Sequence, residues 1–199
     1  GARTHPFWRA LGHQLRCPSG IRGRAIGSIL DIVNAGPLRA ALTELKPDAN
    51  ADVLEIGFGS ERSIVHLLRR NPQLAYCGID QSPDMVRLAS RRHAQAIEDG
   101  RVQLVCGRSD RLPWDDAAFD RALAINVAYF FYRDGRDIRE IHRVLKPGGW
   151  LVLYVTDHVT MQRWPFVTPA THSTFDASSL RQLLRNGGFE ETQIRIESV

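Results

Sequence analysis

The sequence predicts an α/β fold, a doubly wound and mostly parallel sheet with helices on both faces. From residue 52 onward, short apolar runs of strand type alternate with stretches whose apolar residues recur at helical spacing. Turns rich in Gly, Pro and Asn separate them. With 43% hydrophobic and 24% charged residues, the 199 residues have the composition of a soluble domain with a sizeable core. Such alternation builds βαβ units, whose ligands bind at the carboxyl ends of the strands.

The first fifty residues differ, and we predict a helical segment over 1–50. Residues 1–24 mix aromatic, His, Arg, Pro and Gly residues. Residues 26–45 carry apolar residues at helical spacing, interrupted at Gly36 and Pro37. We expect one or two helices that end near Pro47, ahead of an α/β domain over 51–199.

The elements of that domain follow in order along the chain. The expected strands are 52–57, 74–80, 102–107, 121–127 and 150–156, with a last strand over 189–199. The expected helices are 62–70, one that begins at Pro83, 136–145 and 177–186. Ser82 and Asp176 are typical N-caps, Pro83 takes the favoured first helical position, and Gly187 ends the last helix.

The charge balance is basic, with a net charge of +4 and only two lysines among 26 basic residues. A basic chain favours nucleic acids or anionic lipids as partners. The arginines are spread along the whole chain without a dense block. We therefore do not expect a nucleic acid as the partner.

The three cysteines, Cys17, Cys77 and Cys106, lack CxxC spacing. An odd and sparse set indicates neither a disulfide framework nor a metal site, and a cytoplasmic protein is the simplest interpretation. The longest apolar runs, such as 150–155, are too short to span a bilayer, and the first residues lack the apolar segment of a signal peptide.

The loop after the first expected strand is the first feature that points to chemistry. Gly57 and Gly59 let the backbone turn sharply and approach a ligand without a Cβ, and the next helix offers its N-terminal N–H groups to an anion. Asp80, at the end of the second strand, is placed to accept hydrogen bonds from ribose hydroxyls. Arg62 stands where the dinucleotide fingerprint needs its last Gly, which argues against a dinucleotide oxidoreductase.

Five stretches together resemble successive motifs of class I S-adenosylmethionine-dependent methyltransferases. They are VLEIGFG, GIDQSPDMVRLA, LPW, AFDRALAINVAYFF and REIHRVLKPGGWLVLY. The chain is most similar to the ubiquinone/menaquinone-biosynthesis group, over about residues 50–195. The resemblance implies a Rossmann-like methyltransferase fold, with 51–199 as the cofactor-binding domain.

The resemblance also implies S-adenosyl-L-methionine as the cofactor and S-adenosyl-L-homocysteine as its product. By this resemblance the loop at Gly57 cradles the methionine part, and Asp80 holds the ribose hydroxyls. Gln81 and Met85 lie beside the ribose and adenine, and Asn126 lies near the transferable methyl. The full set of implied cofactor residues is Glu55, Gly57, Phe58, Gly59, Glu61, Asp80, Gln81, Met85, Arg108, Ser109, Asp110 and Asn126.

The sequence departs from the family pattern at two of these positions. Glu61 replaces the last Gly of GxGxG, where its carboxylate would repel the cofactor carboxylate unless it points outward or toward the cofactor ammonium. We expect Glu61→Gly to tighten cofactor binding. Arg108 stands where an acid commonly contacts the adenine amine, and Asp110 is the candidate substitute.

The implied reaction is an in-line displacement at the sulfonium methyl, in which the protein aligns the nucleophile and excludes water. A general base is needed only for a nucleophile that holds its proton at neutral pH. His158, just after the fifth expected strand, is the candidate, with His13 and His172 as alternatives.

We expect the acceptor to be a small, apolar or aromatic molecule covered by the N-terminal segment and by residues 157–175. The candidate substrate contacts are Trp8, His13, Tyr129 and Trp164. Tyr129 begins an aromatic run over 129–132 whose ring faces could stabilise a dispersing positive charge.

Two other function classes stay open at this point. One is a methyltransferase fold that no longer methylates and serves as a binding or regulatory module or a related catalyst. Glu61 in the glycine loop favours this class. The other is an RNA- or protein-methylating enzyme, which the many arginines favour. Against it, NVAY replaces the tetrapeptide that is typical of many amino-methylating nucleic-acid enzymes.

The expected strands are one short of the seven in this family's sheet, so we expect the final strand to be lacking. Two explanations stay open. The chain is a piece of a longer protein, or another chain, such as a second copy in a homo-oligomer, covers the exposed sheet edge.

Overall fold

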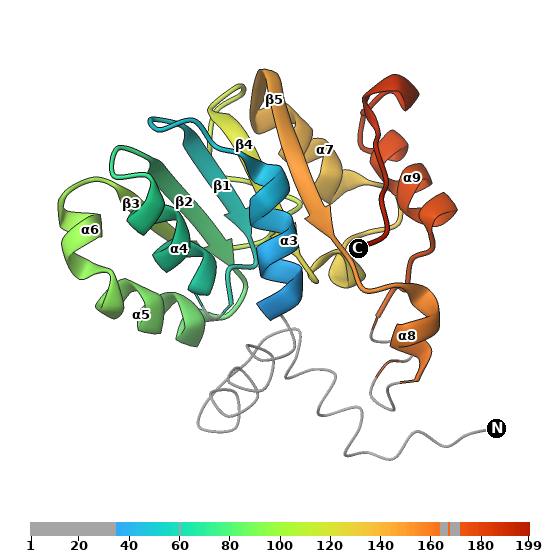
Figure 1. Ribbon diagram of the computed structural model, residues 1–199, viewed down its shortest axis with the longest axis horizontal. Coiled ribbons are helices and arrows are strands. Elements are labelled where there is room, and N and C mark those ends of the chain that lie inside the picture. The colour runs from blue at the N-terminus through green and yellow to red at the C-terminus, as the bar shows by residue number, and fades with distance from the viewer. Residues whose placement is uncertain (1–34, 60, 164–166, 168–171) are drawn as a thin grey trace.

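The computed structural model describes residues 35–59, 61–163, 167 and 172–199, and it confirms the predicted α/β class (Figure 1). Five parallel strands form one sheet in the order β3-β2-β1-β4-β5. The strands are β1 (Asp52–Ile56), β2 (Ala75–Asp80), β3 (Val102–Cys106), β4 (Phe119–Ile125) and β5 (Leu145–Tyr154). The strand order reverses between β1 and β4, so a ligand crevice is expected there, at the carboxyl ends of the strands.

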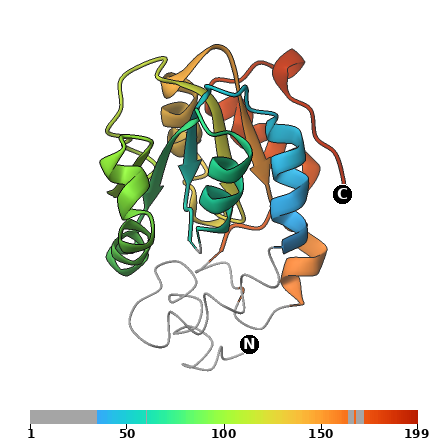
Figure 2. The same cartoon turned by 60° about the vertical axis from the view of Figure 1, so that its left-hand side comes forward.

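Helices cover both faces of the sheet (Figures 1 and 2). The α-helices are α3 (Ala35–Leu45), α4 (Arg62–Arg70), α5 (Pro83–Arg92), α6 (Ala94–Glu98), α7 (Arg136–Val144), α8 (His158–Gln162) and α9 (Ala177–Asn186). Two short 3₁₀ turns, η1 (Ala128–Phe130) and η2 (Glu191–Gln193), complete the list. Between β3 and β4 the chain forms turns and no helix.

The core consists of two apolar layers, one on each face of the sheet. Successive side chains along β1 point to opposite faces of the sheet, so Val53 belongs to one buried cluster and its neighbour Leu54 to the other. The Val53 layer includes apolar residues of α3, α4 and α5, and the Leu54 layer includes those of α7 and α9. Both faces are therefore covered, as a parallel sheet requires.

The predicted last strand over 189–199 is wrong. The structure places η2 at Glu191–Gln193 and assigns no strand to the residues that follow. The alternating apolar residues Ile194 and Ile196 suggested a strand, and Ile196 does pack against the Leu54 layer. The alternation thus reports side-chain burial along an extended segment, without a backbone hydrogen-bond ladder.

One element boundary differs from expectation. Gly36 and Pro37 lie in the first turn of α3, where proline is tolerated, and the helical stretch expected before them lies outside the described residues. The strand expected from Trp150 begins at Leu145, and its register against β4 is irregular between Phe119 and Arg121. The short helices α6 and α8 were not predicted, and most of the expected N-terminal helical segment lies outside the described residues.

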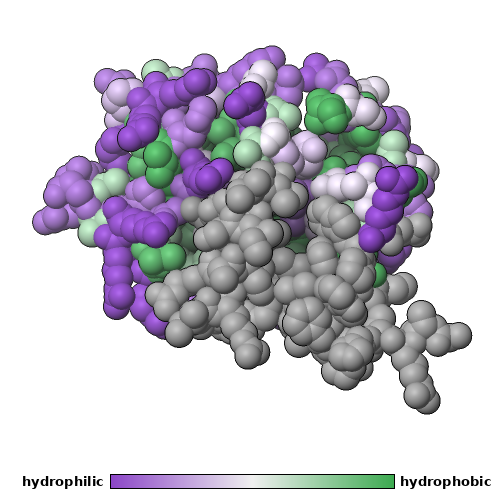
Figure 3. Space-filling view, turned by 60° about the horizontal axis from the view of Figure 1, so that its bottom comes forward, coloured by the Kyte–Doolittle hydropathy of each residue, from purple (hydrophilic) through white to green (hydrophobic). Residues whose placement is uncertain are grey.

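On the side at the bottom of Figure 1, the described surface carries mainly hydrophilic side chains with hydrophobic ones between them (Figure 3). Among the described residues, no helix is both long enough and apolar enough to cross a membrane.

Candidate functional site

The loop after β1 turns by glycine backbone conformations. Gly57 has a φ of +69° and Gly59 a φ of +47°, a region that favours glycine. The Gly57 N–H donates to the carbonyl of Ile79 at 2.7 Å, which holds the loop against β2. A Cβ on Gly57 would lie 2.4 Å from Cγ1 of Val127, so no side chain fits there. The loop is fixed between the carboxyl ends of β2 and β4.

Asp80 ends β2 as a buried carboxylate at the same edge. Its Oδ2 accepts the N–H of Gly59 at 3.1 Å, and its Oδ1 accepts the N–H of Ser82 at 2.8 Å. Burial raises the pKa of Asp80, and these backbone donors oppose that rise. A carboxylate offers about four lone-pair sites, so Asp80 retains acceptor capacity for a vicinal diol. This donor and acceptor set fits a ribose, and therefore fits the nucleoside of the implied cofactor.

Glu55 is a second buried acid, and its exposed fraction is only 3%. The hydroxyls of Ser63 and Tyr76 donate to its Oε2 at 2.5 and 2.6 Å. Burial raises the pKa of Glu55 from 4.5 to about 7, and the two hydroxyl donors lower it less. Glu55 thus connects β1 with α4 and β2 directly below the glycine loop.

Glu61 lies where the glycine loop meets α4, and its side chain is directed toward basic residues at the end of α5. It is the N-cap of α4 with a φ of +62°, and it is 5% exposed. Its carboxylate pairs with Arg92, and its Oε2 lies 3.0 Å from Nε2 of His93, at the end of α5. The side chain therefore links the glycine loop to α5, and its charge faces basic partners.

The other predicted cofactor residues lie around the β2 and β3 ends. Met85 is buried, and its N–H donates to the Ser82 hydroxyl at 3.3 Å. The Ser109 hydroxyl donates to Asp137 Oδ1 at 2.6 Å, which fixes this loop to α7. Phe58, which is buried, and Gln81 flank the two loops.

Arg108 and Asp110 bind one another. The Arg108 guanidinium donates to both Asp110 oxygens at 2.8 Å and to the Tyr132 hydroxyl at 2.7 Å. The hydrogen bonds from Arg108 lower the pKa of Asp110. The second departure from the family pattern is thereby a neutralised pair at the surface of the β3 loop.

At the β4–β5 end, Asn126, Tyr129 and Thr156 form one hydrogen-bonded group. Asn126 has a φ of +54°, and its Oδ1 accepts the Tyr129 hydroxyl at 2.7 Å and the Thr156 N–H at 3.2 Å. The Thr156 N–H also lies 2.5 Å from the Tyr129 hydroxyl oxygen. Burial raises the pKa of Tyr129 to about 12, so the phenol stays protonated.

His158 and His172 flank this group from the chain after β5. His158 is the first residue of α8, and its Nδ1 lies 3.1 Å from the Thr174 hydroxyl. His172 is buried, and its ring centroid lies 6.2 Å from that of Tyr129 and 5.1 Å from that of Phe130. Trp8, His13 and Trp164 lie outside the described residues.

The structure thus collects the predicted residues at one edge of the sheet, in two groups. Glu55, Gly57, Gly59 and Asp80 form the β1–β2 end, and Asn126 and Tyr129 form the β4–β5 end. Thr156 was not predicted from the sequence, although the end of a predicted parallel strand marks it. Ser63, Tyr76 and Asp137 were not predicted either. The acid that Ser63 and Tyr76 contact lies 8 and 21 residues before them, and the partner of Asp137 lies 28 residues before it, so no short motif marks these pairs.

Comparison with known proteins places this geometry in a family. A family model described as a methyltransferase domain matches residues 54–153, about half of the chain. The chain is 27% identical over 148 residues to the uncharacterized methyltransferase YdaC of Bacillus subtilis, covering 74% of this chain and 76% of that protein. It is 34% identical over 126 residues to the demethylmenaquinone methyltransferase of Deinococcus radiodurans, covering 61% and 49%.

A fatty-acid O-methyltransferase of Mycolicibacterium smegmatis is 31% identical over 100 residues, covering 50% of this chain and 35% of that protein. Among solved structures, the [4+2]-cyclase SpnF is 30% identical with a TM-score of 0.64, covering 77% of this chain and 56% of that one. The chain therefore spans about half or less of several relatives that it matches.

The fold and the site define an α/β domain with a glycine loop and a buried carboxylate, Asp80, at the carboxyl edge of its sheet. With the matched family, the chain belongs to the class I S-adenosylmethionine-dependent methyltransferases.

Proposed function

We propose that this protein transfers the methyl group of S-adenosyl-L-methionine to a small, apolar or aromatic acceptor. The observation that carries the proposal is the buried Asp80 carboxylate beside the glycine loop, across the sheet from the aromatic group at Tyr129. The first feature suits a nucleoside with a charged tail, and the second suits an apolar acceptor. S-Adenosyl-L-methionine supplies a sulfonium methyl that is open to nucleophilic attack.

The residues of the β1–β2 end hold and orient the cofactor. Asp80 accepts the ribose hydroxyls, and the backbone at Gly57 and Gly59 admits the methionine part at the N-terminus of α4. Two roles are proposed by family resemblance alone. Gln81 and Met85 contact the ribose and adenine, and the Ser109 backbone meets the adenine edge. These contacts fix the position of the methyl group, which is the main contribution that a displacement reaction needs from the protein.

The residues of the β4–β5 end position the acceptor. Asn126 is held in one orientation by Tyr129 and Thr156, so its amide nitrogen has a fixed direction at the crevice. The Tyr129 phenol stays protonated and donates to Asn126. Tyr129 is therefore proposed to position Asn126 and not to act as a general base. His158 is the proposed base for an acceptor that holds its proton, because it begins α8 at this end of the sheet.

The acceptor class is supported by two findings. Tyr129, Phe130 and His172 form an aromatic group, and the Tyr129 hydroxyl donates to Asn126. Two matched relatives carry names that specify demethylmenaquinone and fatty-acid substrates. An aromatic or apolar acceptor fits both.

A direct test is methyl transfer by the full chain to a panel of phenols, hydroquinones, fatty acids and amines. The proposal predicts S-adenosyl-L-homocysteine and a product heavier by one methyl group in the mass spectrum. His158→Ala should slow transfer to phenols at neutral pH and less so at alkaline pH, where the phenol ionises. Cofactor binding without any methylated product across the panel would contradict the proposal.

A second candidate is a methyltransferase fold that catalyses another reaction. The specific observation is the 30% identity to a [4+2]-cyclase. For that function, S-adenosyl-L-methionine would bind and remain unconsumed while an acceptor-like polyene changes its absorption. Measuring both species in one reaction separates the two candidates.

A further inference from the structure

A groove of about 530 Å³ lies between α3 and α4, which run side by side on one face of the sheet (Figures 1 and 2). Sites for small molecules typically have volumes of roughly 300–1,000 Å³. The groove is lined by residues of these two helices, and none of the residues that form the β1–β2 or the β4–β5 end of the candidate site lines it. The methyltransferase chemistry described above therefore does not use this groove.

The groove is basic, because helical spacing places the cations of α4 on one side of that helix. Arg62, His66 and Arg70 follow one another at intervals of four residues, and all three line the groove. Arg39 lines it from α3. α4 contains no acidic residue, and no acid is among the described residues that line the groove.

The arginines of the groove are not neutralised by nearby carboxylates. Glu44 is the acid of α3, but it does not line the groove, and it pairs with Arg195. In the described part of the chain, no carboxylate pairs with Arg39 or with Arg70. The positive charge of the groove is therefore available to an anion from solution.

These like charges act on one another along α4. Burial and then the charge of Arg70 lower the pKa of His66, so the imidazole is neutral at neutral pH while the arginines stay charged. Like charges four residues apart destabilise a helix. The row of cations thus contributes nothing to folding by itself, and a bound anion would offset its repulsion.

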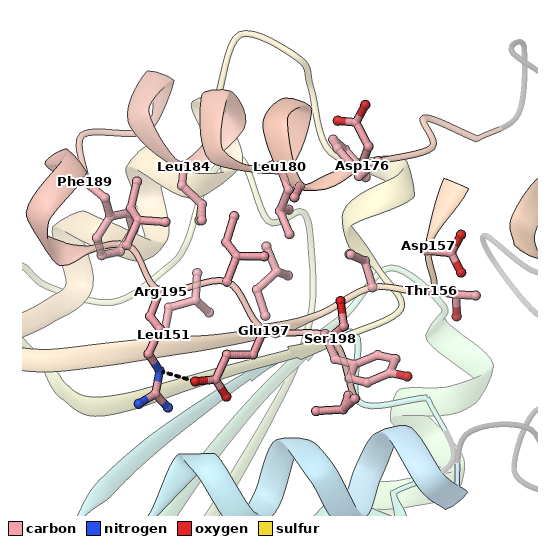
Figure 4. A pocket seen from close by; sticks show the side chains of 18 of the residues that line it. Leu151, Thr156, Asp157, Asp176, Leu180, Leu184, Phe189, Arg195, Glu197 and Ser198 are labelled. Carbon is pink, nitrogen blue, oxygen red and sulfur yellow. Dashed lines mark ion pairs between the residues drawn. The ribbon is translucent and has the colours of Figure 1, made fainter. Parts of the chain in front are cut away.

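A second cavity shows the opposite character. It has a volume of about 610 Å³ and lies beside β5, where Asp157 and Asp176 line it (Figure 4). Hydrogen bonds from Thr160 and Ser179 lower the pKa values of these two acids, so both are ionised at neutral pH. Carboxylates disfavour an anion, so a small anion would select the groove between α3 and α4.

The length and the charge of the groove indicate which anion fits. Arg62 and Arg70 lie eight residues apart, which is about 12 Å along the helix axis and too far for one phosphate group to contact both closely. One phosphate ester carries a charge of about −1.5 to −2, whereas Arg39 makes a third full positive charge in the groove. Two linked phosphates match both the length and the charge better.

The chemistry of the walls also suits phosphate groups. The guanidinium of arginine presents a planar fork of donors that matches the oxygens of a phosphate. Leu38 and Leu42 line the same groove from α3 and are half-buried. Apolar walls around charges of one sign focus the electric field and concentrate a small counter-ion.

We propose that the groove between α3 and α4 binds a small ligand with a diphosphate group. Arg39 and Arg70 donate to the phosphate oxygens from the two helices, and Arg62 extends the row toward the glycine loop. The site is separate from the cofactor site, and the inference does not rest on the proposed function.

The test is calorimetric binding of inorganic pyrophosphate to the full chain at neutral pH and low ionic strength. Arg39→Gln and Arg70→Gln each remove a charged donor, so each should weaken binding about tenfold or more. Arg69→Gln is the matched control, because it removes the same charge from the same turn of α4 but does not line the groove. Its affinity should stay within about twofold of the wild type.

Thermal melts show whether the variants fold. Without ligand, Arg39→Gln and Arg70→Gln should melt at or above the wild-type temperature, because both side chains are exposed and Arg70→Gln also relieves repulsion. Pyrophosphate should raise the melting temperature of the wild type and of Arg69→Gln. It should not do so when both Arg39 and Arg70 are replaced.

Two further ligands define the bound group. Inorganic phosphate should bind at least about tenfold more weakly than pyrophosphate, because it cannot reach both helices and the length of the row. ADP is measured with S-adenosyl-L-homocysteine present, so that its ribose does not compete for Asp80. Tighter binding of ADP than of pyrophosphate would identify the ligand as a diphosphate ester, and weaker binding would identify it as free diphosphate.

Failure of pyrophosphate to bind would overturn the inference, as would equal affinity for phosphate and pyrophosphate. Equal losses in Arg69→Gln and Arg70→Gln would show general charge attraction and no site. Single-stranded RNA or phosphatidylglycerol vesicles that bind through Arg39 and Arg70 more tightly than pyrophosphate would also overturn it, because the groove would then belong to a macromolecular surface.

Discussion

The two ends of the candidate site are built in different ways. At the β1–β2 end, Asp80 and the glycine loop are held by backbone N–H groups and by backbone conformation. At the β4–β5 end, Asn126 and Tyr129 hold each other through side chains, with Thr156 as the third member. Backbone geometry tolerates little change, whereas a side-chain group can be replaced member by member. We infer that the first end serves a constant cofactor and the second a variable acceptor.

We expect the largest effect from a substitution that disrupts only the β1–β2 end. Asp80→Asn removes the charge that accepts the ribose hydroxyls and the Gly59 and Ser82 N–H groups. Hydrogen bonds to charged groups contribute about 1.5–3 kcal/mol, so affinity for S-adenosyl-L-homocysteine should fall on the order of 100-fold. Calorimetry measures this change in affinity. Asp84→Asn, which removes an acid that pairs with Arg87 on the same helix, should bind like the wild type.

The glycine loop is the next target. Gly57→Ala adds a Cβ that lies 2.4 Å from Val127 Cγ1, at a φ of +69°. Left-handed strain and overpacking together should lower the free energy of unfolding by about 2–4 kcal/mol. Gly100→Ala has the same sign of φ but open space around it, so it should show only the strain. Equal losses in both variants, measured by urea denaturation, would show that Val127 does not constrain the loop.

The acid below the loop should make stability depend on pH. The pKa of Glu55 is about 7 in the folded protein, above its ordinary value of 4.5. The folded state therefore holds the proton more tightly, so this group's contribution to stability is full below pH 4.5 and is lost as pH rises to about 7. The loss should be on the order of 3 kcal/mol.

Glu55→Gln should remove that dependence, because the amide oxygen still accepts the Ser63 and Tyr76 hydroxyls and carries no charge. The difference in unfolding free energy between the variant and the wild type should grow in favour of the variant from pH 5 to pH 7. A difference that stays constant over this range would mean that Glu55 titrates normally.

A change at the β4–β5 end should have a smaller effect and a different signature. Tyr129→Phe removes the hydroxyl shared by Asn126 and Thr156. Stability should fall by about 1–2 kcal/mol, because the buried partners lose one hydrogen bond. Methyl transfer should slow, while affinity for S-adenosyl-L-homocysteine should stay within twofold. A large loss of cofactor affinity would show that the two ends are not separate.

The smallest expected effect concerns Glu61. From the sequence we expected Glu61→Gly to tighten cofactor binding, but its carboxylate faces Arg92 and His93. Because this charge is paired with Arg92 and not aimed at the cofactor, we now expect affinity to change by less than about tenfold, or about 1.4 kcal/mol. Glu61→Gln keeps the left-handed backbone and removes the charge, so it serves as the matched variant. If calorimetry finds that both variants bind the cofactor tenfold or more tightly than the wild type, the Glu61 carboxylate does repel the cofactor, as the sequence suggested.

The sequence predicted the parts of the fold that have a local cause. The first four strands and the caps at Ser82 and Asp176 follow from periodicity and capping chemistry, and the structure contains them. The prediction of a last strand was wrong, because the alternation of Ile194 and Ile196 indicates which side chains are buried and cannot show whether a neighbouring strand is present to pair with. The site divides in the same way. Asp80 and the glycine loop were predictable from strand ends, whereas the partners of Glu61 and the role of Thr156 depend on contacts distant in sequence.

The central claim is that the β1–β2 end holds S-adenosyl-L-methionine. The most direct measurement is a crystal structure of the full chain with S-adenosyl-L-homocysteine. We expect the ribose hydroxyls on the Asp80 carboxylate and the homocysteine part against Gly57 and Gly59. A ligand seated elsewhere, or with its ribose away from Asp80, would contradict it.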